Sequence, residues 1–95
     1  MNIKITQPAL RWFQDEFDLK EGDTIRFHAR YGGCGSVQSG FSLGITKDKL
    51  TDPGATFEKD GITYGVEQKD LWYFDDKDLT VKFSRKFDEI QFLVE

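Results

Sequence analysis

The chain has 95 residues, the size of one domain with a single hydrophobic core. Aromatic residues make up 15% of it, so bulky rings supply much of that core and disorder is not expected. Because 13 basic residues stand against 17 acidic ones, the formal charge is -4, and we expect neither a nucleic acid nor an anionic membrane as partner.

Cysteine usage and the N-terminus both favour a reducing compartment. Cys34 is the only cysteine, which excludes an internal disulfide. The first residues show no basic segment followed by an apolar stretch, and no run of about 18 apolar residues could span a bilayer. We therefore expect a cytoplasmic protein.

An amphipathic helix is predicted from Thr6 to about Phe17. Thr6 is a suitable N-cap, and Pro8 falls in the first turn, where a missing amide hydrogen does no harm. Ala9, Phe13 and Phe17 recur every fourth residue and form one apolar stripe. We interpret this stripe as a surface that docks on the core rather than as a direct functional site.

Apolar and polar residues alternate along most of the remaining chain, which predicts strands. The strands cover Ile25 to Tyr31, Phe41 to Ile45, Ala55 to Lys59, Ile62 to Glu67, Leu79 to Phe83 and Ile90 to Val94. Asp60-Gly61 predicts a two-residue hairpin, because these residues accept positive φ angles. One helix followed by short strands predicts a mainly β domain, a sandwich or barrel with an N-terminal helix packed on it.

The most unusual segment surrounds the only thiol with glycine: Tyr31-Gly32-Gly33-Cys34-Gly35-Ser36. Glycines let backbone amides approach the sulfur, where they could stabilise a thiolate or a sulfide-bearing ligand. The alternative is a tight loop with a small buried thiol, and composition alone favours that alternative.

His28 is the only imidazole, six residues before Cys34 on the polar face of a predicted strand. It could act as a base or as a metal ligand only if the glycine-rich segment folds back toward it. A solvated surface histidine is the favoured interpretation, because no third group orients the ring. For want of a base beside the thiol, we do not expect an enzyme.

The order of motifs along the chain adds to these observations. Gly32-Gly33-Cys34 is followed by Asp60-Gly61-Ile62, by Leu71-Trp72-Tyr73-Phe74-Asp75 and by Phe87 to Phe92. In this order, from Ile3 to Phe92, the chain resembles the HesB-like, or A-type, iron-sulfur biosynthesis family. The resemblance implies a single HesB-like domain over residues 1–95, which assembles as dimers or larger oligomers. It also implies that the protein receives iron or a cluster and delivers it to apoprotein clients.

The resemblance assigns the ligand role to Cys34, which matches the first of the family's three ligand cysteines. Gly33 and Gly35 flank it as cofactor-binding residues, and His28 is a weaker possible ligand. The family's other two cysteines belong to a C-terminal Cys-Gly-Cys segment, and this sequence ends at Glu95 without one. Since clusters are normally held by about four protein ligands, one protomer is expected to be an incomplete site.

Two hypotheses follow from this departure. In the first, the Cys34 residues of two subunits share iron or a cluster, and the protein is a carrier. In the second, the protein has kept the fold and lost the metal. It then binds a protein partner through an exposed face of Tyr31, Trp72 and Tyr73.

Overall fold

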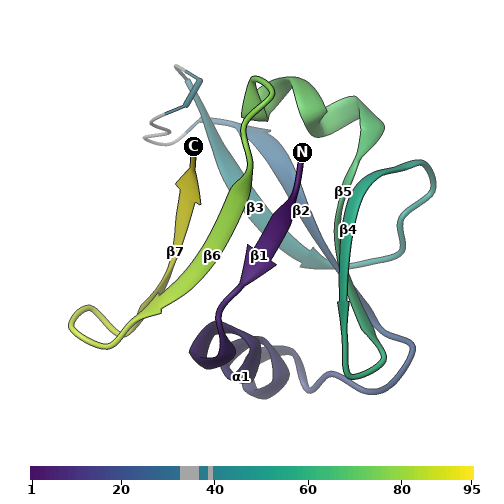
Figure 1. Ribbon diagram of the computed structural model, residues 1–95, viewed down its shortest axis with the longest axis vertical. Coiled ribbons are helices and arrows are strands. Elements are labelled where there is room, and N and C mark those ends of the chain that lie inside the picture. Colours follow the sequence, from purple (N-terminus) through teal and green to yellow (C-terminus); the bar gives the residue numbers. More distant parts are fainter. Residues whose placement is uncertain (33–36, 39) are drawn as a thin grey trace.

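Two β-sheets and an N-terminal helix form the framework of the computed structural model, which describes residues 1–32, 37–38 and 40–95 (Figure 1). In chain order the elements are β1 (Ile3–Ile5), α1 (Gln7–Phe17), β2 (Thr24–Tyr31), β3 (Phe41–Lys47), β4 (Pro53–Lys59), β5 (Ile62–Glu67), the 3-10 helix η1 (Gln68–Phe74), β6 (Leu79–Ser84) and β7 (Glu89–Val94). The predicted mainly β fold with an N-terminal helix is confirmed.

The strands pair in the orders β3-β2-β5-β4 and β1-β6-β7. β2 runs parallel to β5 and β1 runs parallel to β6, whereas the other neighbours are antiparallel. The two sheets face each other, since the rings of Phe27 on β2 and Phe92 on β7 meet edge to face at 5.9 Å. The sheets form a sandwich that does not close into a barrel, and α1 lies across one of its ends (Figure 1).

Helix α1 docks on the core by the face that its spacing predicts. Ala9 and Phe13 are fully buried, and the Phe13 ring lies 5.8 Å from Phe27 and 5.5 Å from Tyr64. Thr6 holds the N-cap position, but its side chain makes no capping hydrogen bond. The predicted N-cap residue is therefore confirmed, without a side-chain capping bond. The backbone N–H of Thr6 donates to the carbonyl of Val81 at 3.0 Å and so ties the helix to β6.

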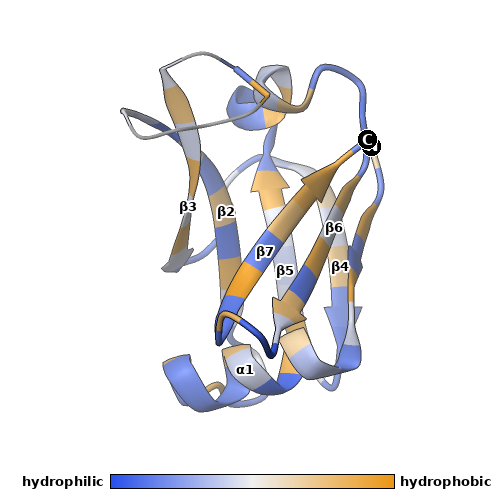
Figure 2. Ribbon diagram, turned by 90° about the vertical axis from the view of Figure 1, so that its left-hand side faces the viewer, coloured by the Kyte–Doolittle hydropathy of each residue, from blue (hydrophilic) through white to orange (hydrophobic). Residues whose placement is uncertain are grey.

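Apolar bands alternate with polar ones along β6 and β7, as the sequence pattern predicts (Figure 2). The Asp60-Gly61 hairpin between β4 and β5 is also confirmed, with φ angles of 54° and 77°. Among the helices of the described ranges, none has both the length and the apolar character that a bilayer span requires.

Candidate functional site: an aromatic surface beside the glycine-rich segment

The predicted ligand Cys34 and its neighbours Gly33 and Gly35 lie outside the described residues. The structure does describe the base of their segment, where β2 passes to β3. There the backbone N–H of Gly32 donates to the carbonyl of Gly40 at 2.6 Å, and the Ser42 hydroxyl donates to the carbonyl of Gly32 at 3.1 Å. Both glycines have positive φ angles, 99° and 82°, which side chains rarely allow. The two strands therefore close the segment at its base.

His28 lies on β2 opposite Gly44 of β3. A Cβ atom on Gly44 would come within 2.5 Å of the imidazole Cε1, so the ring rests directly on that glycine. Among the described residues, no group of three or more His, Cys, Asp or Glu side chains could hold a metal ion. A metal role for His28 stays a prediction, since it depends on where the thiol lies.

Three aromatic rings interlock beside the base of the glycine-rich segment, and we call Tyr31, Phe41 and Trp72 the aromatic surface. The Phe41 ring meets Tyr31 at 5.6 Å and Trp72 at 5.0 Å, both edge to face. Tyr31 is 87% exposed and Trp72 49% exposed, while Phe41 is half-buried between them. The surface thus presents large rings to solvent in a fixed arrangement.

Tyr73 does not belong to this surface, and the prediction that it is exposed is wrong. It is only 3% exposed, and Phe74 beside it only 1%. In a 3-10 helix of three residues per turn, consecutive side chains point about 120° apart, so Trp72 can face solvent while its neighbours enter the core. Burial raises the pKa of the Tyr73 hydroxyl.

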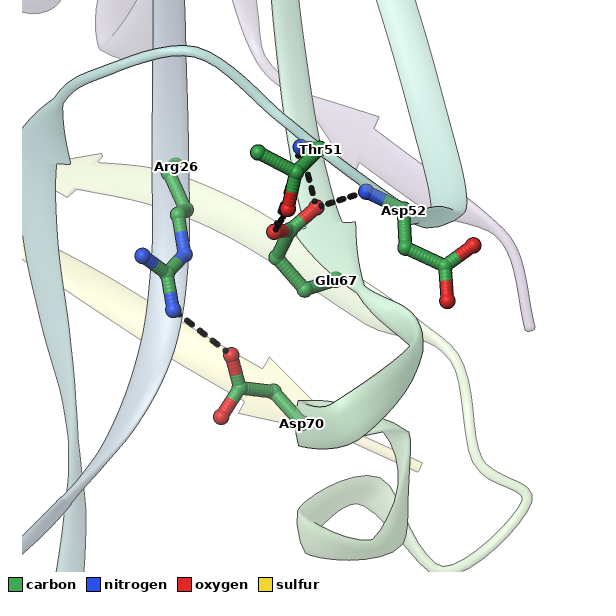
Figure 3. A network of polar contacts seen from close by, with 5 residues as sticks. All are labelled: Arg26, Thr51, Asp52, Glu67 and Asp70. Atoms are coloured by element: carbon green, nitrogen blue, oxygen red, sulfur yellow. Dashed lines mark hydrogen bonds and ion pairs between the residues drawn. The ribbon is translucent and has the colours of Figure 1, made fainter.

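A polar network fixes the start of η1 (Figure 3). The buried carboxylate of Glu67 accepts hydrogen bonds from the Thr51 hydroxyl at 2.7 Å and from the backbone N–H groups of Thr51 and Asp52 at 3.0 Å. The Thr51 hydroxyl, these backbone groups and the nearby Arg26 charge lower the pKa of Glu67, although its burial acts the other way. The carboxylate therefore stays ionised and holds the β3–β4 connection against η1.

On the other side of this junction, Arg26 of β2 reaches Asp70 of η1. Its Nη2 donates to Asp70 Oδ2 at 3.2 Å, and the two side chains are 19% and 9% exposed. Figure 3 shows the guanidinium of Arg26 turned toward Asp70. Sequence reasoning missed this pair, because the partners lie 44 positions apart and neither stands in a recognisable motif.

A hollow of about 630 Å³ lies at the other end of the molecule, between α1 and the β6–β7 turn. Arg11, Trp12, Phe83 and Arg85 contribute to its lining together with acidic side chains. Both arginines are exposed. None of the residues predicted for a site lines this hollow. We assign no ligand to it.

The fold and the sequence together define the class of protein. The profile of the iron-sulphur cluster biosynthesis family matches residues 1–95, and the chain belongs to this family. The solved structure of Escherichia coli SufA, described as involved in biosynthesis of iron-sulfur clusters, superposes with a TM-score of 0.69 at 19% identity. The superposition covers 98% of the present chain and 80% of the SufA chain. The predicted HesB-like fold is thereby confirmed.

Curated relatives are more similar in sequence. The chain is 53% identical over 89 residues to the pyruvate dehydrogenase inhibitor of Bacillus subtilis, a match that covers 94% of both proteins. It is also 39% identical over 93 residues to an uncharacterized protein of Staphylococcus epidermidis, covering 95% of both. An uncharacterized protein of Staphylococcus saprophyticus is 37% identical over 95 residues, covering 97% of both.

Proposed function

We propose that this protein acts by binding another protein, and that its partner is a pyruvate dehydrogenase whose activity it lowers. The observation that carries this proposal is the 53% identity to the Bacillus subtilis inhibitor across 94% of both chains. The single cysteine also suits a protein that binds another protein rather than a cluster, since a cluster needs several thiolates.

The aromatic surface is the part of the molecule best suited to such a partner. Tyrosine and tryptophan are enriched among the residues that dominate binding energy at protein interfaces. Here Tyr31 and Trp72 are exposed, and the ring of Phe41 holds each of them edge to face. Because the rings are already ordered, less side-chain entropy is lost when a partner covers them.

The test is an inhibition assay with the pyruvate dehydrogenase complex of Bacillus subtilis. Added protein is expected to lower the rate of NADH formation in a dose-dependent way, and Trp72→Ser or Tyr31→Ser to weaken that effect. Phe87→Ser is the matched control, because Phe87 is 60% exposed but lies in the β6–β7 turn, away from the aromatic surface. An unchanged rate of NADH formation at saturating wild-type protein would contradict the proposal. Equal loss of inhibition in all three variants would mean that the aromatic surface does not contact the partner.

Iron or cluster binding is the second candidate, and the family match over residues 1–95 favours it. One thiolate cannot fill the positions around iron, and the described residues of one copy contain no cluster of three or more His, Cys, Asp or Glu side chains that could hold it. A carrier would therefore pair two copies so that both Cys34 thiolates hold the cargo, with an external thiol or His28 completing the site. Its partners would be iron-sulfur assembly proteins or apoprotein clients.

Anaerobic reconstitution with iron, sulfide and glutathione tests this second candidate. Carriage predicts visible absorption bands, about one cluster per dimer, and loss of both in Cys34→Ser. Equal uptake of iron and sulfide by wild type and Cys34→Ser would exclude it. The two candidates also separate in the first assay, because a metal-free inhibitor keeps its effect when Cys34 is replaced.

A further inference from the structure

One ion pair joins η1 to β2 beyond the point where β2 and β5 stop pairing. β5 pairs with β2 only as far as Arg26, which lies opposite Gly65. Two residues later β5 ends and the chain continues as η1. Among the described residues, the only side-chain hydrogen bond between η1 and β2 is the one from Arg26 to Asp70.

This ion pair is poorly hydrated. Asp70 is 7% exposed as a residue, and Arg26 Nε is buried without a hydrogen-bond acceptor in the part of the chain that the structure describes. Removing one partner of such a pair leaves an uncompensated charge in a region of low dielectric, which is far more costly than the pair itself is stabilising. The carboxylate of Asp70 would then have to reach water.

Asp70 and Trp72 are rigidly linked, since they stand two positions apart in a single short helix. Any movement of η1 that brings Asp70 toward water also moves the Trp72 ring, which now lies 5.0 Å from Phe41. Tyr73, one 3-10 turn after Asp70, lies on the same side of η1 and is buried, as is Phe74 beside it. Because these two rings keep η1 on the core, the movement expected on loss of the pair is a small shift of η1 and not its unfolding.

We propose that Arg26 is a positioning residue: by holding Asp70, it fixes the position of η1 against β2 so that Trp72 closes on Phe41 and completes the aromatic surface. This inference rests on the proposed protein-binding function, because it assigns that surface the contact with the partner. Arg26 itself acts through Asp70 and does not touch the partner.

The first arm of the test follows Trp72 without any partner. In a Trp12→Phe background Trp72 is the only tryptophan, so its emission and its quenching by acrylamide report on that ring alone. Arg26→Met is expected to shift the emission to longer wavelength and to increase quenching, whereas Arg26→Lys, which keeps the charge, retains most of the native signal. Native emission in Arg26→Met would overturn the positioning role.

The second arm measures inhibition of the pyruvate dehydrogenase complex. Arg26→Met is expected to need a roughly ten-fold higher concentration for half inhibition. The double variant Arg26→Met/Asp70→Leu removes both charges of the pair, and it should regain native emission and most of the inhibition. Native emission with lost inhibition in the double variant would mean that Arg26 contacts the partner itself, and failure to regain native emission would mean that the pair does not act by cancelling its own charges. Either result goes against the proposal. If wild type does not inhibit, the proposed function falls, while the emission arm still decides the role of Arg26.

Discussion

The hydroxyl of Tyr64 shows how a single buried atom can cost stability. The side chain is fully buried, with its ring 5.5 Å from Phe13 and 6.2 Å from Phe57. Its Oη has no hydrogen-bond partner among the described residues, and burial, with the negative charge of Asp60, raises the pKa of the group. The hydroxyl is therefore a neutral polar group that has lost water and gained nothing.

We predict that Tyr64→Phe increases the free energy of unfolding by about 1 kcal/mol, because it removes an unsatisfied polar atom and keeps the ring. Urea titration followed by far-UV circular dichroism measures the change. A clear loss of stability would show that the hydroxyl has a partner.

Phe13 is the residue whose loss should damage the core most directly. Its ring is fully buried and contacts rings on β2, β5 and α1 itself, so its removal leaves a cavity in the core. Phe13→Ala is expected to cost roughly 3 to 5 kcal/mol. Guanidinium titration measures this loss, and Cys34→Ser should be tolerated in the same experiment. Equal stability of Phe13→Ala and wild type would contradict the assigned face of the helix.

At the scale of elements, the carboxylate of Glu67 joins the β3–β4 connection to η1, and this junction should be sensitive to acid. Its pKa lies below the ordinary value of 4.5 in the folded protein, so the unfolded chain binds the proton more readily. The stabilisation is complete above the unfolded pKa and is lost as the pH falls through the folded pKa.

Glu67→Gln and Thr51→Val test this junction by changing its two partners separately. The first removes the titrating group, and the second removes the hydroxyl that does most to lower its pKa. Both variants are therefore expected to lose less stability than wild type between neutral pH and the region below pH 4.5, in thermal unfolding measured across that range. Identical pH profiles for all three proteins would mean that Glu67 does not titrate with folding.

The same elements show what local sequence could predict. Alternation identified β2, β3, β6 and β7, and Asp60-Gly61 identified the hairpin of β4 and β5 for a similarly local reason. Neither signal could identify η1, because its four consecutive bulky residues, Leu71 to Phe74, show no periodic pattern. The exposure of Trp72 and the burial of Tyr73 therefore depended on how η1 docks. The Arg26–Asp70 pair was equally hidden, since it depends on the parallel pairing of β2 with β5.

At the scale of the whole molecule, α1 lies across one end of the sandwich, and η1 lies at the opposite end (Figure 1). The rings of the aromatic surface meet there, where Trp72 of η1 contacts Phe41 of β3. Of the predicted site, the sequence could supply Tyr31, Trp72 and the glycine-rich segment by residue type. It could not supply Phe41 as the ring that joins them, because that contact is made only when η1 approaches the start of β3. Residue type identifies candidates, and packing decides which of them form a surface.

The stability of this sandwich should not depend on metal. Its buried core is hydrophobic and draws on α1 and both sheets, from Ile3 and Ala9 to Tyr64 and Val81. Since that core closes through side-chain packing, folding need not wait for a ligand to organise it, unlike that of small zinc domains. We predict that excess chelator leaves the cooperative thermal transition and its midpoint unchanged. The control is the same scan of protein reconstituted with iron and sulfide, where any bound cluster would add stability in proportion to its affinity. A broad or lost transition in chelator alone would mean that metal holds the fold together, and the metal-free inhibitor would then be the wrong account.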